Sequence, residues 1–122
     1  MTKKILIIED NEQNRVLMRM IIKPLQCEIL EAENGEQGIR LAKEQNPDLV
    51  LMDLQMPKMD GLTATKIIKN DPETKDIKII AVTSYAMKGD REKALSAGAD
   101  DYISKPVDIH TLTAMIRRHL GI

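Results

Sequence analysis

The amino-acid sequence predicts an α/β fold built on a doubly wound parallel sheet of five strands and five helices. Short apolar runs alternate with segments of helical periodicity along all 122 residues. The inner runs are apolar on both faces, which is typical of a sheet covered by helices on both sides. No repeat or linker divides residues 1–122, which are therefore expected to form one domain.

The first strand is expected at Ile5–Ile8, a run rich in β-branched residues. A helix is expected from Glu12 to about Leu25, and Pro24 should end or kink its last turn. The apolar residues that recur at helical spacing in this helix are Val16, Leu17, Met20 and Ile21.

The next elements are expected to be a strand at 28–32, a helix at 36–45 and a strand at 49–52. The run 28–32 is mixed in polarity, which favours a place near the edge of the sheet. Asn46-Pro47 closes the second helix. The run 49–52 is the most apolar, which favours the middle of the sheet.

A third helix is expected from Gly61 to about Asn70, followed by a strand at 77–82. The fourth helix should run from Lys88 to Ala97, with Gly98 as its C-terminal stop.

The fifth strand should be short, at 102–104. Asp108 is expected to cap a last helix that ends at Leu120. The residues expected on the inner face of this helix are Ile109, Leu112, Met115 and Ile116.

The composition excludes several classes of protein. The chain has 43% hydrophobic and 30% charged residues and a formal net charge of −1, so nothing points to nucleic acid or to an anionic membrane. No run approaches the roughly 20 apolar residues of a membrane span, and no signal peptide opens the chain. The single cysteine, Cys27, cannot form an internal disulfide. These features favour a cytoplasmic protein.

Polar side chains gather where the predicted strands end. Glu9 and Asp10 follow the first strand, Asp53 the third, Thr83 the fourth and Lys105 the fifth. The carboxyl ends of parallel strands meet at one edge of such a sheet, and ligands bind there. We therefore expect these side chains to form one site.

The residue types in this site favour phosphoryl chemistry. Clustered carboxylates repel one another unless a cation joins them, and carboxylate oxygens suit Mg²⁺. A hydroxyl and a lysine can bind a phosphoryl group, and a carboxylate can accept one. Asp53 lies on the middle strand and is the expected acceptor. Taken singly, Asp53 could also cap a turn, Glu9 and Asp10 could cap a helix, and Lys105 could be solvated.

The chain resembles the receiver domain of two-component response regulators over essentially its whole length. The segments that carry the resemblance are ILIIEDNEQNR, PDLVLMDLQMPKMDG, IIAVTSYAMKGD and GADDYISKPV. The resemblance implies a flavodoxin-like (βα)₅ fold of strand order 2-1-3-4-5. It also implies that Asp53 is phosphorylated, and that Glu9, Asp10 and Asp53 hold Mg²⁺ together with the Gln55 backbone carbonyl. Thr83 and Lys105 would contact the phosphoryl group.

The resemblance further implies a switch and two partner surfaces. Thr83 would move toward the phosphate and Tyr102 would turn inward, which would change the face made by the fourth helix, fifth strand and fifth helix. A downstream protein partner would bind that face. The phosphodonor, a histidine kinase or a histidine phosphotransfer protein, would contact Asn14, Arg15, Met18 and Pro106. The resemblance implies a cis Lys105–Pro106 bond, and a bulky Tyr85 would shield the phosphate from water.

The expected function is that of a single-domain response regulator, with no enzyme activity beyond its own phosphorylation and dephosphorylation. It would be a monomer or a phosphorylation-dependent dimer. The alternatives are a receiver excised from a hybrid histidine kinase, and an aspartyl-phosphate phosphohydrolase. Gln55 argues against the phosphohydrolase, since such enzymes need an acid two residues after the nucleophile. A flavin carrier is disfavoured because Glu9 and Asp10 would repel a phosphate.

His110 and His119 are expected to be solvated.

Overall fold

The sheet contains five parallel strands in the order β2-β1-β3-β4-β5, as expected. The structure is a computed structural model that describes residues 2–84 and 89–122. The strands are β1 (Lys4–Ile8), β2 (Glu28–Ala32), β3 (Leu49–Asp53), β4 (Lys78–Thr83) and β5 (Asp101–Ser104). The helices are α1 (Glu12–Ile22), α2 (Gly35–Gln45), α3 (Gly61–Asn70), α4 (Asp90–Ser96) and α5 (Ile109–Leu120).

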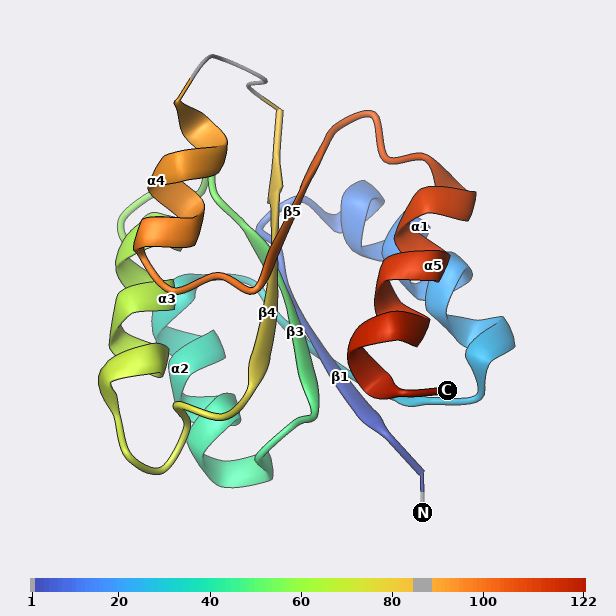
Figure 1. The fold of residues 1–122 in the computed structure, drawn as a ribbon, viewed down its shortest axis with the longest axis horizontal. Helices are drawn as coiled ribbons and strands as arrows, with labels where there is room; N and C mark the ends of the chain where they lie inside the picture. Colours follow the sequence, from blue (N-terminus) through green and yellow to red (C-terminus); the bar gives the residue numbers. More distant parts are fainter. Residues whose placement is uncertain (1, 85–88) are drawn as a thin grey trace.

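The helices form two layers, one on each face of the sheet. Figure 1 shows α1 and α5 on one face and α2, α3 and α4 on the other. Each layer encloses its own apolar core. Leu6, Ile8, Val50 and Met52 point toward the α2–α3–α4 side, whereas Ile5, Ile7, Leu49 and Leu51 point toward the α1–α5 side. The alternation explains why β1 and β3 are apolar at every position of their central run.

Pro24 ends the first helix as expected. The α-helix stops at Ile22, and a short 3₁₀ turn (Lys23–Leu25) carries the proline in its first positions. Gly98 stops α4 as expected, with a φ of 111° that an L side chain rarely adopts. The expected start of α4 at Lys88 lies outside the described residues.

The buried faces of two helices differ from the sequence expectation. In α1 the buried residues are Met18, Ile21 and Ile22, whereas Val16, Leu17 and Met20 are partly exposed, Met20 to 67%. In α5, Ile109 is 54% exposed and does not line the core. It is the first residue of the helix, directly after the Asp108 cap.

Candidate functional site

The predicted site residues lie together at the carboxyl edge of the sheet. β3 is paired with β4 so that Asp53 lies opposite Val82. The residue that follows, Thr83, is bonded to the loop after β5 because the Lys105 backbone N–H donates to the Thr83 carbonyl at 2.7 Å. Glu9 directly follows β1, on the other side of β3. The pairing of parallel strands thus brings together residues up to 96 positions apart in the sequence.

The acidic residues of the site differ in burial. Glu9 and Asp53 are buried, and so is the Thr83 side chain, whereas Asp10 is exposed. Buried carboxylates are rare unless they are paired. The Leu49–Met52 run is fully buried, so its packing forces the next residue, Asp53, into the interior. Asp53 is therefore held where a carboxylate needs a compensating charge.

Lys105 provides part of that charge. Its Nζ lies 2.9 Å from Glu9 Oε1 and 3.6 Å from Asp53 Oδ1. A single ammonium group thus contacts two buried carboxylates. The Lys105–Pro106 peptide bond is cis, as the resemblance implied.

The pKa values of the two buried carboxyls are shifted in opposite directions. Burial, with a smaller contribution from the neighbouring Glu9, raises the pKa of Asp53 to about 8, although the Gln55 amide and Lys105 act to lower it. Burial acts on Glu9 too, but its interactions with Asp53 and Lys105 outweigh that effect, and the pKa of Glu9 is lowered. Burial of two neighbouring carboxyls therefore favours retention of a proton on Asp53 when no metal is bound.

The carboxylates have the chemistry and spacing of a metal site. Glu9, Asp10 and Asp53 each offer one oxygen atom, and these atoms lie within 4.8 Å of one another. The second oxygen of Glu9, Oε2, is buried and has no hydrogen-bond partner in the described part of the chain. An unpartnered carboxylate oxygen in such a cluster fits a hard divalent cation such as Mg²⁺. The donor set therefore suits the predicted ion.

Gln55 contributes more to the site than the sequence suggested. The resemblance implies that its backbone carbonyl binds the metal, and the structure adds further contacts. Its backbone N–H donates to Asp53 Oδ1 at 3.1 Å. Its side chain reaches across to β4, where Nε2 donates to Thr83 Oγ1 and Oε1 accepts from the Ser84 N–H at 2.8 Å. Its position two residues after the acceptor was visible in the sequence, but the direction of its side chain was not.

The residues predicted to contact a phosphodonor divide into two groups. Asn14 and Pro106 line a hollow of about 180 Å³ between α1 and the loop after β5, beside Lys105. Met18 lies at the floor of this hollow and is only 2% exposed. Leu17, which is partly exposed and lines the same hollow, was not predicted.

Arg15 is not an open surface residue, contrary to expectation. Its side chain is 12% exposed and forms an ion pair with Glu31 at 3.4 Å. Its guanidinium also donates to the backbone carbonyl of Glu9 at 2.8 Å. Arg15 thus fixes the end of β1 against α1 and the edge strand β2.

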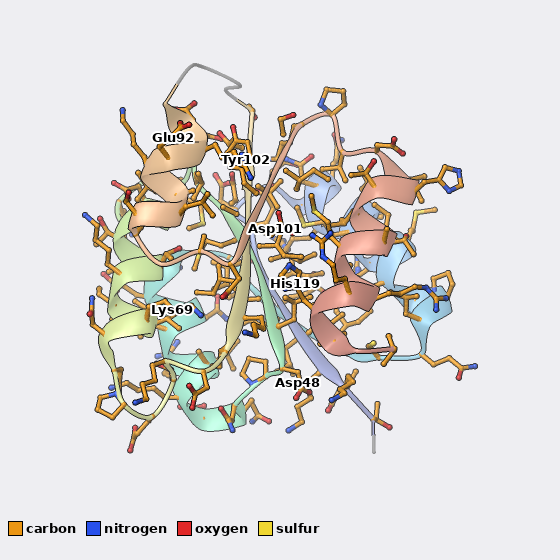
Figure 2. The ribbon with its side chains drawn as sticks, viewed as in Figure 1. Asp48, Lys69, Glu92, Asp101, Tyr102 and His119 are labelled. Carbon is orange, nitrogen blue, oxygen red and sulfur yellow. The ribbon has the colours of Figure 1, made fainter. Side chains whose placement is uncertain are left out.

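The expected switch residue Tyr102 is partly buried and packs against the apolar core on the α4 side (Figure 2). On the neighbouring helix, His119 is partly buried, whereas the sequence predicts a solvated side chain. Its Nε2 lies 2.9 Å from Asp101 Oδ2, and Figure 2 shows the two residues on facing elements. His110 is exposed, as expected. Tyr85, expected to shield a phosphate, lies outside the described residues.

The chain is similar to one family of known proteins. Residues 5–117 match the model of the response regulator receiver domain. The chain is 43% identical over 121 residues to the polar-differentiation response regulator DivK of Brucella ovis. The matched region covers 99% of this chain and 98% of that protein.

Two solved structures are also similar. One is the receiver domain of the sensor histidine kinase PA1611 from Pseudomonas aeruginosa PAO1, with a magnesium ion coordinated in its active-site cleft. It is 34% identical with a TM-score of 0.91, and all of both chains is covered. The other is a chain of the co-crystal of the Saccharomyces cerevisiae histidine phosphotransfer protein Ypd1 and the receiver domain of its downstream response regulator Ssk1. It is 29% identical with a TM-score of 0.88, over 95% of this chain and 87% of that one.

In the described ranges 2–84 and 89–122, no helix is long and apolar enough to cross a membrane.

Proposed function

Because the chain belongs to the family of response regulator receiver domains, we propose that it takes up a phosphoryl group on Asp53 within a two-component phosphorelay. The observation that carries the proposal is the burial of Asp53 at the end of β3, within 3.6 Å of the Lys105 ammonium and beside Glu9. A structural aspartate would be paired with one cation or would cap a turn. Here two buried carboxylates share one lysine.

The chemical step is a transfer from a phosphohistidine donor. An Asp53 carboxylate oxygen attacks phosphorus, so a P–O bond forms while the donor's P–N bond breaks and its electron pair returns to the imidazole nitrogen. Lys105 is placed to offset the charge on the transferred group, and the Thr83 hydroxyl is at the same edge of the sheet. Asp53 must be ionised to attack, which requires loss of the proton that its raised pKa retains.

Glu9, Asp10 and Asp53 would hold Mg²⁺ through their carboxylates, together with the Gln55 backbone carbonyl. The metal would neutralise charge between the acceptor and the phosphoryl oxygens. The unpartnered Glu9 Oε2 supports this assignment, and so does the magnesium ion in the cleft of the PA1611 receiver.

The donor would be a histidine kinase or a histidine phosphotransfer protein. The hollow lined by Asn14, Leu17 and Pro106 opens beside Lys105 and is largely apolar at its floor, which suits a docking helix. The Ssk1 receiver, which this chain resembles, is crystallised with such a phosphotransfer protein.

The output would be a change in the α4–β5–α5 face. Phosphorylation adds about −1.5 to −2 charges next to buried Thr83. Thr83 would shift toward the phosphate and Tyr102 would turn inward, a population shift between two states that a downstream protein recognises.

The closest chemical alternative, a phosphohydrolase, is disfavoured because Gln55 offers no acid and its amide is bonded to β4. The cellular site of action would be the cytoplasm.

The test is intact-mass measurement after incubation with acetyl phosphate, with and without Mg²⁺. The wild type should gain one phosphoryl group only with Mg²⁺, and Asp53→Asn should gain none. Retained labelling at another residue in the variant would refute the assignment of the acceptor. If the wild type gains nothing, a purified phosphohistidine protein replaces acetyl phosphate as the donor. Failure with that donor as well would refute the function.

The proposed switch has a separate test. Thr83→Ala should still be phosphorylated on Asp53, but the spectrum of the Tyr102 ring, recorded by NMR, should change less than in the wild type. An equal change in both proteins would show that Thr83 does not couple the site to Tyr102.

A further inference from the structure

Gln55 joins the loop after β3 to the end of β4 through its side-chain amide. Nε2 donates to Thr83 Oγ1, and Oε1 accepts from the Ser84 N–H at 2.8 Å. A backbone N–H can only donate, so the amide oxygen must face Ser84 and the amide nitrogen must face Thr83. The backbone N–H of the same residue donates to Asp53 Oδ1 at 3.1 Å. Gln55 therefore contacts the proposed acceptor and two neighbouring groups of β4 at once.

We propose that these two side-chain hydrogen bonds form a latch, which holds Thr83 and Ser84 in the arrangement of the unphosphorylated protein and must open when Asp53 is phosphorylated. The inference rests on the proposed function. It makes Gln55 a positioning residue that opposes the switch, a role distinct from binding a metal through its backbone carbonyl.

The latch opposes the switch because the phosphoryl group would compete with Gln55 for the Ser84 N–H and for the position of Thr83. A phosphoryl group on Asp53 brings three acceptor oxygens to the edge where β4 ends. The Ser84 N–H carries one proton, so it cannot make full hydrogen bonds to Gln55 Oε1 and to a phosphoryl oxygen together. The Thr83 hydroxyl accepts from Gln55 Nε2 and can still donate its own proton, so this contact is lost only when the side chain moves toward the phosphate, as the proposed switch requires.

Burial makes this competition matter. Thr83 is fully buried, and Gln55 is only partly exposed, so water does not easily replace the lost contacts. The contacts also link separate elements, since 28 residues separate Gln55 from Thr83. Removing the amide should therefore favour the phosphorylated arrangement by roughly 3- to 10-fold, the effect of about one net hydrogen bond.

The experiment compares Gln55→Leu, which keeps the bulk of the side chain but not its amide, with the matched control Gln45→Leu. Gln45 is exposed at the end of α2, at the opposite edge of the sheet. Two quantities are measured by NMR: the hydrogen-exchange rate of the Ser84 amide in the metal-free protein, and the affinity for beryllofluoride, a phosphoryl mimic, in the presence of Mg²⁺. Thermal unfolding is recorded alongside.

In Gln55→Leu, the Ser84 amide should exchange at least about tenfold faster, and beryllofluoride should bind roughly 3- to 10-fold more tightly. Gln45→Leu should match the wild type in both. Equal or weaker binding of beryllofluoride by Gln55→Leu overturns the latch, even if its thermal stability falls, because a purely structural role would alter stability alone. If neither the wild type nor the variant binds beryllofluoride, the proposed function itself is wrong, and the latch falls with it.

Discussion

Two clusters of partly or fully buried charge lie at opposite edges of the same sheet and differ in how well they are satisfied. At the amino edge, Lys69 Nζ donates to Asp100 Oδ2 at 2.8 Å and to the Ile77 carbonyl at 2.7 Å. The same Asp100 oxygen accepts from the Ile79 N–H at 2.9 Å. The Lys78 ammonium lies 4.0 Å from the other oxygen, Asp100 Oδ1. In this cluster, one anion is therefore matched by two cations, and backbone groups complete the shell.

At the carboxyl edge, the balance is different. Lys105 meets two carboxylates, those of Glu9 and Asp53, and Glu9 Oε2 has no hydrogen-bond partner among the residues described. Removing one partner of a buried charge pair is destabilising, because the other charge is left uncompensated. The amino-edge groups therefore satisfy one another within the fold, whereas the carboxyl-edge cluster keeps a binding capacity that a metal and a phosphoryl group would fill. Residue types alone do not separate the two clusters, but their partners do.

The largest effect on stability is expected at the amino edge. Asp100→Ala leaves the Lys69 ammonium without its carboxylate and the Ile79 N–H without its acceptor, so it should lower the free energy of unfolding by about 2–3 kcal/mol. Urea unfolding measures this loss. Mg²⁺ should not restore it, and a variant within about 0.5 kcal/mol of the wild type would mean that the paired cluster is not structural.

One glycine packs against each of the two clusters, Gly61 at the carboxyl edge and Gly98 at the amino edge. A Cβ on Gly61 would lie 2.2 Å from the Asp53 carbonyl oxygen, whereas one on Gly98 would lie 2.8 Å from Lys69 Cγ. Gly61→Ala should cost about 1–3 kcal/mol and slow phosphoryl uptake, because it displaces the acceptor's own backbone. Gly98→Ala should destabilise through its φ of 111° without slowing uptake. Equal uptake rates in the two variants would contradict this separation.

Lys105→Met tests whether the carboxyl edge depends on a cation. It leaves two buried carboxyls with no ammonium, so the metal-free protein should lose about 1–2 kcal/mol of stability. Saturating Mg²⁺ should recover part of the loss, since the metal can replace the missing charge. A loss that Mg²⁺ does not change would indicate that the metal binds elsewhere.

The remaining expected effect is a dependence of stability on pH. The pKa of Asp53 is raised to about 8 from its ordinary 3.8, so the metal-free folded state binds a proton that the unfolded chain releases. The stabilisation from this proton is complete below pH 3.8 and is lost as pH rises through 8. From pH 5 to 8 in EDTA, the wild type should therefore lose stability relative to Asp53→Asn. A constant difference across that range would show that Asp53 is ionised throughout.

The sequence predicted the fold well because the signals were local. Element bounds agree to within one or two residues over most of the chain, and the Asp108 cap and the Pro24 stop are both present. The site residues could also be predicted, since parallel strands must bring their carboxyl ends to one edge. That rule needs only the order of the strands and the residue that follows each one.

The remaining features depend on contacts between distant residues. Arg15 turns inward because Glu31 of the edge strand pairs with it, and His119 is held by Asp101 across 18 residues. Periodicity shows that a helix has an apolar face but not how it is rotated, so Met18 appeared open when it is buried. The amide of Gln55 was missed for the same reason, since its partners lie on another strand.

The most direct test of the account is urea unfolding of Asp53→Asn and Asp100→Asn in EDTA at pH 8. Asp53→Asn leaves one carboxylate for one lysine, so it should be more stable than the wild type by about 1–3 kcal/mol, whereas Asp100→Asn should be less stable. Saturating Mg²⁺ should stabilise the wild type and have less effect on Asp53→Asn. If both variants are destabilised to the same extent, the two edges are equally structural, and the carboxyl edge is not held in readiness for a metal and a phosphoryl group.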